Sequence, residues 1–190
     1  ISKNATTGAI TTQSSINSSG IASFDANTLA TEAGTGITTG SGTVYRSSIQ
    51  RVGGIITTRI LIDLTGLRST AGGDIIGVDG TSLVCHIGQI TAAQNGTILT
   101  GSMECFEAPT GGDPDINVHS ATEGTGIEDG AISSLTETSL VDAGDATLGS
   151  KVYFTAVPAA DEFLYLTCGT TTDGDFTAGK LLIELMGYAA

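Results

Sequence analysis

The chain has no tryptophan, only three prolines and three cysteines, and seven basic residues against twenty acidic ones. Its formal net charge of −13 means that nucleic-acid phosphates would repel it, so we expect no direct nucleic-acid partner. No stretch of about 18 apolar residues occurs, so we expect no transmembrane helix and no membrane partner. An odd number of cysteines without CxxC spacing argues against both a disulfide framework and a zinc site.

The cysteines, Cys85, Cys105 and Cys168, lie far apart, each in a segment expected to be a strand. We predict that they are buried free thiols made in a reducing cytoplasm. The first residues lack the basic and apolar regions of a signal peptide. Because the chain begins with Ile1 rather than Met, we expect an upstream segment to be absent or processed.

Glycine, threonine and β-branched residues are abundant, which favours strands and tight turns over helices. Residues 1–42 are small, polar and nearly uncharged, and offer too little apolar surface to fold alone. We therefore predict an extended, low-complexity N-terminal arm over residues 1–42, either flexible or ordered against neighbouring subunits. An all-β domain is predicted over residues 43–190.

Period-two alternation is clearest in residues 55–65, where one face is apolar or Thr and the other carries Arg59 and Asp63. The residues of the apolar face are Ile56, Thr58, Ile60, Ile62 and Leu64. Further strands are predicted at Thr43–Arg51, Leu83–Ile90, Ile98–Glu107, Ile116–Ser120, Val152–Val157, Glu162–Cys168 and Lys180–Met186. Gly- and Asp-rich turns separate them, which indicates a β-sandwich or jelly-roll-like domain. The stretch Ile132–Ala143 is also compatible with one short helix.

No catalytic or cofactor-binding residue is predicted. Residues 174–180 satisfy GxxxxGK, but Leu181 follows instead of Ser or Thr, and the segment reads as a strand rather than as a helix. His86 and His119 are the two histidines, and His86 is expected to face solvent or a subunit contact. Alternation would place Glu104 and Glu107 on opposite faces of a strand, so they do not form a glycosidase pair.

Several aspartates stand in pairs that suit the hard oxygen coordination of Ca²⁺. These pairs are Asp113 with Asp115, Asp142 with Asp145, and Asp173 with Asp175. No twelve-residue calcium loop with a terminal Glu is present, and Asp is common in turns for its own backbone hydrogen bonds. We predict no metal site from them.

Four arginines gather in one region, where they alternate with apolar residues. They are Arg46, Arg51, Arg59 and Arg68. Two interpretations fit this pattern: a solvated strand face, or contacts to an acidic partner.

Several segments resemble a family of virion structural proteins of marine bacteriophages, notably those of cyanobacteria. The segments with family character are Tyr45–Ile60, Leu61–Gly66, Ile75–Gly80, Cys85–Ala92 and Glu162–Tyr188, and the matching phrases include IDLTGL, HIGQIT and GDFTAGKLLIELMGY. The resemblance implies a non-enzymatic capsid decoration, or cement, protein that forms homotrimers and bridges major capsid subunits. Such a protein would be synthesised in the bacterial host cytoplasm and would lie on the capsid surface of the virion. Arg46, Arg51 and Arg59 are the residues predicted to contact the partner.

Two other functions compete with capsid decoration. A phage tail or spike component, or a receptor-binding adhesin, is the alternative, although no long repeats are seen and tryptophan platforms for glycans are lacking. An enzyme such as a polysaccharide depolymerase is the least favoured, because it requires a carboxylate pair that the sequence does not offer.

Overall fold

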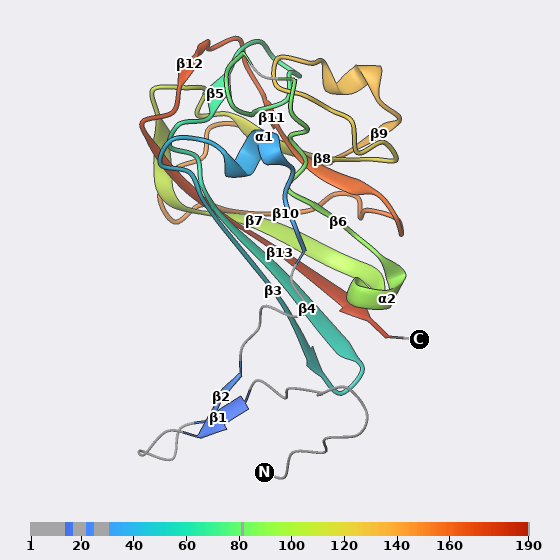
Figure 1. Cartoon of the computed structure of the whole chain (residues 1–190). Helices are drawn as coiled ribbons and strands as arrows, with labels where there is room; N and C mark the ends of the chain where they lie inside the picture. The colour runs from blue at the N-terminus through green and yellow to red at the C-terminus, as the bar shows by residue number, and fades with distance from the viewer. Residues whose placement is uncertain (1–13, 17–21, 25–30, 81, 190) are drawn as a thin grey trace.

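The computed structural model describes residues 31–80 and 82–189, together with the backbone of residues 14–16 and 22–24 (Figure 1). Helices in this part of the chain are single turns: α1 (Thr35–Thr38), α2 (Ala92–Asn95) and the 3-10 turn η2 (Ile132–Ser134). None of them has the length or apolar character to cross a membrane. Strands make up the other regular elements, which confirms the predicted all-β class.

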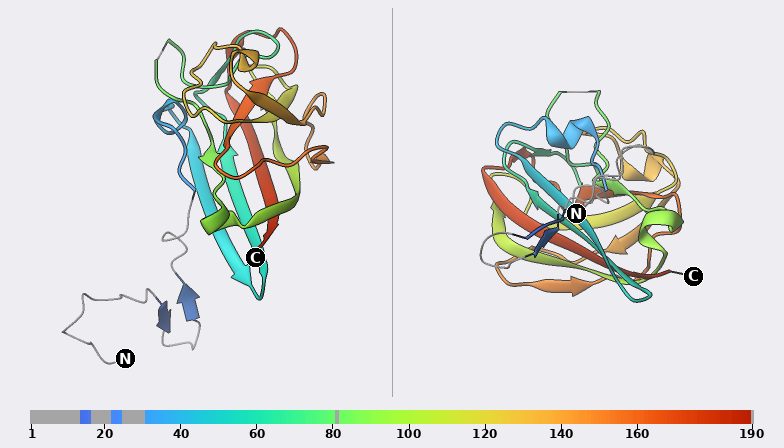
Figure 2. Two further views of the ribbon diagram at one scale, coloured as in Figure 1. Left: turned by 90° about the vertical axis from the view of Figure 1, so that its right-hand side faces the viewer. Right: turned by 60° about the horizontal axis from the view of Figure 1, so that its bottom comes forward.

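Two antiparallel sheets pack together as a sandwich (Figures 1 and 2). The larger sheet has the order β10-β7-β13-β4-β3 and consists of β3 (Val44–Val52), β4 (Ile55–Asp63), β7 (Thr97–Thr110), β10 (Lys151–Tyr153) and β13 (Ala178–Tyr188). The smaller sheet has the order β6-β11-β8-β9 and consists of β6 (Gly88–Gln89), β8 (Ile116–Ala121), β9 (Glu137–Val141) and β11 (Phe163–Cys168). Two short ribbons pair β1 (Ser14–Ile16) with β2 (Ala22–Phe24), and β5 (Arg68–Ser69) with β12 (Gly174–Asp175).

The core lies between the sheets because alternate residues of each long strand point inward. In β13, Leu181, Ile183 and Leu185 are buried while their neighbours are more exposed. The predicted inner face of β4 is buried as well, which confirms its period of two. In the smaller sheet, β11 is buried at nearly every position, and the hydroxyl of Tyr165 donates to the carbonyl of Glu123 at 2.7 Å.

Most of the predicted strands are present, and two are shorter than predicted. In Leu83–Ile90 only Gly88 and Gln89 form a strand, because the amides before them bond to other segments of the chain: Cys85 N donates to Gly126 O at 2.8 Å. The segment Val152–Val157 leaves the larger sheet after Tyr153, and Thr155 N donates to Leu140 O of β9 at 2.9 Å. This short crossing ties the two sheets together.

The helix considered for Ile132–Ala143 is wrong. The chain makes the 3-10 turn η2 and then enters β9, which pairs with β8. β-branched residues such as Thr138 and Val141 favour a strand once a neighbouring strand is available to pair with.

The boundary predicted between the N-terminal arm and the domain, at residue 42, lies too far along the chain. Residues 1–30 lie outside the described part except for the backbone of β1 and β2. Residues 31–42 pack onto the domain: Ile37 is fully buried in the core, Thr31 is buried, and Gly36 N donates to Val84 O at 2.8 Å. Single apolar residues in a polar stretch gave no periodic signal, so the sequence did not reveal this docking.

Two glycines with positive φ test this docking, because they differ in what surrounds them. Gly66 (φ +80°) lies so close to Ser41 that a Cβ would stand 2.3 Å from its carbonyl oxygen, whereas Gly53 (φ +61°) has nothing within 4 Å. We expect Gly66→Ala to lower the free energy of unfolding by about 3 kcal/mol or more, and Gly53→Ala by about 1 kcal/mol from backbone strain alone. Urea denaturation of both variants measures the difference. Equal losses would contradict the packing of residues 31–42.

Candidate interaction surfaces

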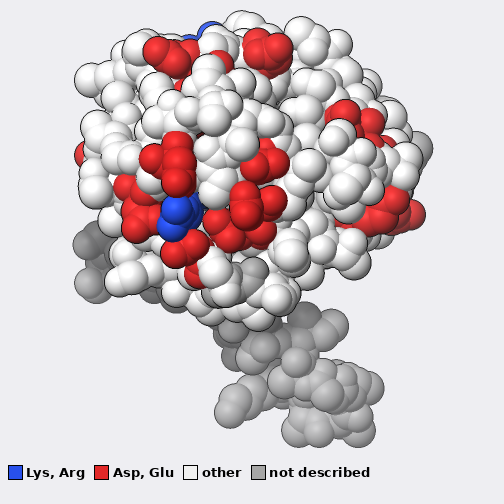
Figure 3. All heavy atoms as spheres, turned by 90° about the horizontal axis from the view of Figure 1, so that it is seen from above, with Lys and Arg blue, Asp and Glu red and all other residues white. Residues whose placement is uncertain are grey.

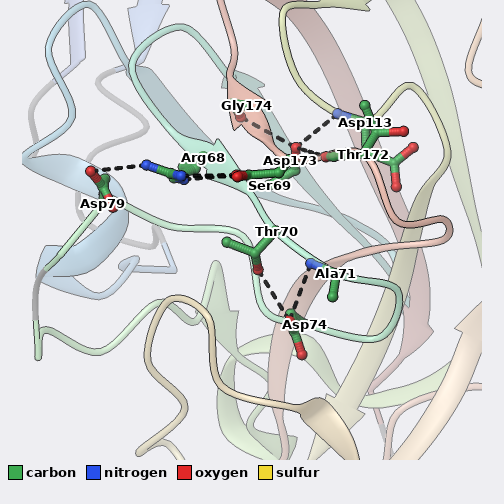
Figure 4. A network of polar contacts seen from close by, with 10 residues as sticks. All are labelled: Arg68, Ser69, Thr70, Ala71, Asp74, Asp79, Asp113, Thr172, Asp173 and Gly174. Atoms are coloured by element: carbon green, nitrogen blue, oxygen red, sulfur yellow. Dashed lines mark hydrogen bonds and ion pairs between the residues drawn. The ribbon is translucent and has the colours of Figure 1, made fainter.

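One end of the sandwich, around β5 and β12, is rich in carboxylates (Figure 3). At its centre Arg68 forms an ion pair with Asp79 at 3.1 Å and donates two hydrogen bonds to Asp173, at 3.0 and 3.2 Å (Figure 4). These contacts raise the pKa of Arg68, with Asp173 the main cause. Arg68 therefore holds together two acidic loops that would otherwise repel each other. We call this region the acidic end.

Other aspartates at the acidic end stabilise turns. Asp113 is fully buried, and its carboxylate accepts from Thr170 N and Thr170 Oγ1, both at 2.8 Å. Asp113 N donates to Ser69 Oγ at 2.8 Å, and Ser69 Oγ donates to Thr172 O at 2.7 Å (Figure 4). These bonds fasten the loop after β7 to the loop after β11. The side-chain oxygens of Asp113 thus serve the backbone, as is usual for Asp in turns.

Two of the aspartate pairs weighed for calcium come close together. Asp115 pairs with Asp145 through an isolated β-bridge. Burial is the main cause of the raised pKa of Asp115, and Asp113, Asp142 and Asp145 raise it further. Asp115 Oδ1 is buried without a hydrogen-bond partner in the described structure. Within residues 31–80 and 82–189, no three His, Cys, Asp or Glu side chains form a group suited to a metal ion.

The histidines occupy structural positions. The ring centroid of His86 lies 5.0 Å from that of Phe163 and 6.5 Å from that of Tyr165. Burial lowers the pKa of His86, whose side chain is half-buried beside these two rings. A subunit contact of His86 stays a prediction. His119 Nδ1 lies 2.8 Å from a carboxylate oxygen of Glu137 on the neighbouring strand.

The three cysteines are buried and free, as predicted, although Cys85 lies outside the strands. Burial raises the pKa of Cys85 to about 11 and that of Cys168 to about 12, and it also raises the pKa of Cys105. Thiols with such pKa values are protonated at neutral pH and are poor nucleophiles.

The prediction that Glu104 and Glu107 lie on opposite faces of a strand is wrong. Leu181 pairs with Cys105 but Lys180 pairs with Glu107, so a bulge at Phe106 brings both glutamates to the same face. Each glutamate binds a lysine there: Glu104 lies 3.3 Å from Lys151, and Glu107 contacts Lys180. Lys180, the lysine of the GxxxxGK match, lies in a strand as predicted.

The other face of the larger sheet, which points away from the smaller sheet, forms what we call the outer face. Strand register places these residues in rows across β3, β4, β13 and β7. One row reads Arg46, Leu61, Leu182, Glu104. The rows on either side of it read Val44, Asp63, Lys180, Glu107 and Ser48, Arg59, Glu184, Ser102. Within these rows, residues on neighbouring strands form ion pairs, including Arg59 with Glu184 at 2.6 Å and Lys180 with Asp63 at 3.3 Å.

Acidic residues are missing from the part of the larger sheet nearest the turn that joins β3 to β4, and Figure 2 shows where this turn lies. Residues 47–58, 90–102 and 185–189 contain no Asp or Glu. They meet in space: Asn95 Nδ2 donates to Thr58 Oγ1 at 2.8 Å, and Ala189 N donates to Gly54 O at 2.9 Å. Exposed apolar side chains gather here, namely Val52, Ile55, Leu99, Met186 and Tyr188. We call this region the acid-free tip.

The three arginines predicted to contact a partner do not share one face. Arg46 and Arg59 lie on the outer face, while Arg51 lies on the opposite face, where it donates to Ala93 O and to Gln94 O of α2. Arg59 has Glu184 as its partner. Arg46 bonds only the carbonyl of Tyr45 and has no carboxylate within ion-pair distance in the described part of the chain. A contact with a partner stays a prediction for all three.

We predict that Asp115→Asn stabilises the protein at neutral pH. The pKa of Asp115 is raised in the folded state, so its stabilising contribution is complete below the ordinary value of 3.8 and is lost as pH rises through the folded pKa. Relative to the wild type, Asn should therefore gain about 1 kcal/mol at pH 7 and nothing at pH 3 in urea denaturation. Asp173→Asn, which removes a partner of Arg68, is the control and should not stabilise at pH 7. A loss of stability in Asp115→Asn at pH 7 would contradict the conclusion that burial and the neighbouring aspartates disfavour the charged carboxylate of Asp115.

The chain matches no protein-family model, no curated protein sequence and no solved structure. Three features of the described residues bear on function: the acidic end, the outer face and the acid-free tip.

Proposed function

We propose that this chain is a non-enzymatic structural protein of a bacteriophage virion, which decorates and stabilises the capsid by bridging major capsid subunits. It attaches through the acid-free tip and points its acidic end into solvent. The observation that carries the proposal is the segregation of charge along the sandwich, from the carboxylates near Arg68 to the apolar side chains near Val52.

Charge segregation matters because the chain as a whole carries −13 charges. A docking surface has to give up its water, and a carboxylate that is buried without a partner costs several kcal/mol. The acid-free tip avoids this cost and offers apolar area in exchange. Among the surfaces described above, it is the one best suited to dry contact with another protein.

The tip is also held firmly, which lowers the entropy lost on binding. Arg51 bonds two carbonyls of α2, and the amide of Ala189 bonds Gly54 in the turn between β3 and β4. The ring of Tyr188 packs so closely against Gly54 that a Cβ there would lie 2.7 Å from it. Three segments far apart in the sequence thus form one rigid surface.

The properties of the acidic end support the proposal that this end points into solvent. A hydrated, negative surface facing outward keeps decorated particles apart and repels nucleic acid. The sequence resemblance to virion structural proteins supports the same role.

Val52→Asp should weaken attachment to particles at least tenfold, because it places a carboxylate in the acid-free tip. Val52 is 68% exposed, so folding should be unaffected. The measurement is co-sedimentation of the purified variant with virions from a phage that lacks the gene.

Leu148→Asp is the matched control, since Leu148 is 74% exposed, lies outside the tip and receives the same charge. It should bind like the wild type. Equal binding by all three proteins would contradict attachment through the tip. A wild-type chain that binds isolated tails and not capsids would favour the tail or spike role.

A further inference from the structure

The outer face is nearly neutral on a strongly acidic molecule. It carries four of the seven basic residues of the chain but only four of the twenty acidic ones. The basic residues are Arg46, Arg59, Lys151 and Lys180, and the acidic ones are Asp63, Glu104, Glu107 and Glu184. Two copies of a chain with a charge of −13 repel each other over most of their surface. They can approach closely only through a face of this kind.

The charges on this face are also arranged so that they complement themselves. Consider a two-fold axis parallel to the strands, running between β4 and β13. Rotation about it lays β3 of one copy over β7 of the second, and β4 over β13. This rotation does not shift residues along the strand direction. Each residue therefore lies opposite the residue of the same row on the strand that it now faces.

The contacts that result pair opposite charges and place apolar residues together. Arg59 meets Glu184, and Asp63 meets Lys180, so ion pairs within each chain become four-membered charge clusters between chains. In the row between them, Leu61 meets Leu182 at the centre. The arrangement has an apolar middle and a charged surround, as protein interfaces commonly do.

Arg46 supplies the independent observation. On the outer face it is the basic side chain without a carboxylate partner among the described residues. Under the two-fold rotation it meets Glu104, which lies in the same row of the other copy. An arginine without a carboxylate partner among the described residues thus gains one in the pair.

We propose that the outer face binds a second copy of this chain, with the two larger sheets packed face to face about this two-fold axis. Sheets packed face to face in this way lie about 10 Å apart. Arg46 of each copy pairs with Glu104 of the other. This inference goes beyond the proposed function and does not depend on a viral role. Strand register also places Val52, Ile55 and Tyr188 of the acid-free tip on the outer face, so the contact between copies extends towards the tip.

A charge swap in the purified full-length chain tests the pairing. We expect the wild type to sediment at equilibrium as a dimer, at twice the 19.1 kDa of one chain. Arg46→Glu puts two like-charge pairs into the interface and should raise the dissociation constant at least about tenfold. The double variant Arg46→Glu with Glu104→Arg should restore it. Leu148→Asp, outside the outer face, should leave it unchanged.

Other results overturn the inference. A monomer at all concentrations would show that the outer face does not bind a second copy. Either another occupant, such as the N-terminal segment, covers this face, or the face stays uncovered. A trimer, which the family resemblance implies, would exclude a two-fold contact as the assembly unit. A dimer that Arg46→Glu leaves intact, or that the charge swap does not restore, would place the contact elsewhere. Circular dichroism of each variant checks folding. Because Val52 also lies on the outer face, Arg46→Glu, which lies outside the tip, is added to the particle-binding experiment: a variant that no longer dimerises but still binds particles separates this inference from the proposed function.

Discussion

The double pairing of β13 is the interaction on which the rest of the structure depends. This strand bonds β4 on one side and β7 on the other over almost its whole length. Its inward residues, such as Ile183, fill the core between the two sheets, and its outward residues, such as Leu182 and Glu184, form the middle of the outer face. Burial on one side therefore fixes the register that aligns the charges on the other.

The main difference between the surfaces of this molecule is their distribution of charge. The acidic end uses its carboxylates to shape loops around Arg68 and Asp113, while residues 47–58, 90–102 and 185–189 of the acid-free tip contain no Asp or Glu. Between them the outer face balances its charges row by row. An acidic protein that must adhere needs such places, because desolvating unpaired carboxylates would cost more than apolar contact gains.

Local signals in the sequence predicted much of the fold and little of the surfaces. Alternation predicted β4 and β13, because burial of one face imposes a period of two. It failed for Glu104 and Glu107, because the bulge at Phe106 leaves no local signal. Arg59 and Glu184 stand 125 residues apart, so their ion pair depends on a register that only the folded sheet defines. The docking of Ile37 was missed for the same reason, since its partners are distant in the chain.

The most direct test of the account is a cryo-electron microscopy map of intact virions. We expect density for the sandwich at regular positions on the capsid, with the turn between β3 and β4 against the shell and the loops around Arg68 facing outward. Density confined to the tail, or a sandwich that contacts the shell through the loops around Arg68, would contradict it.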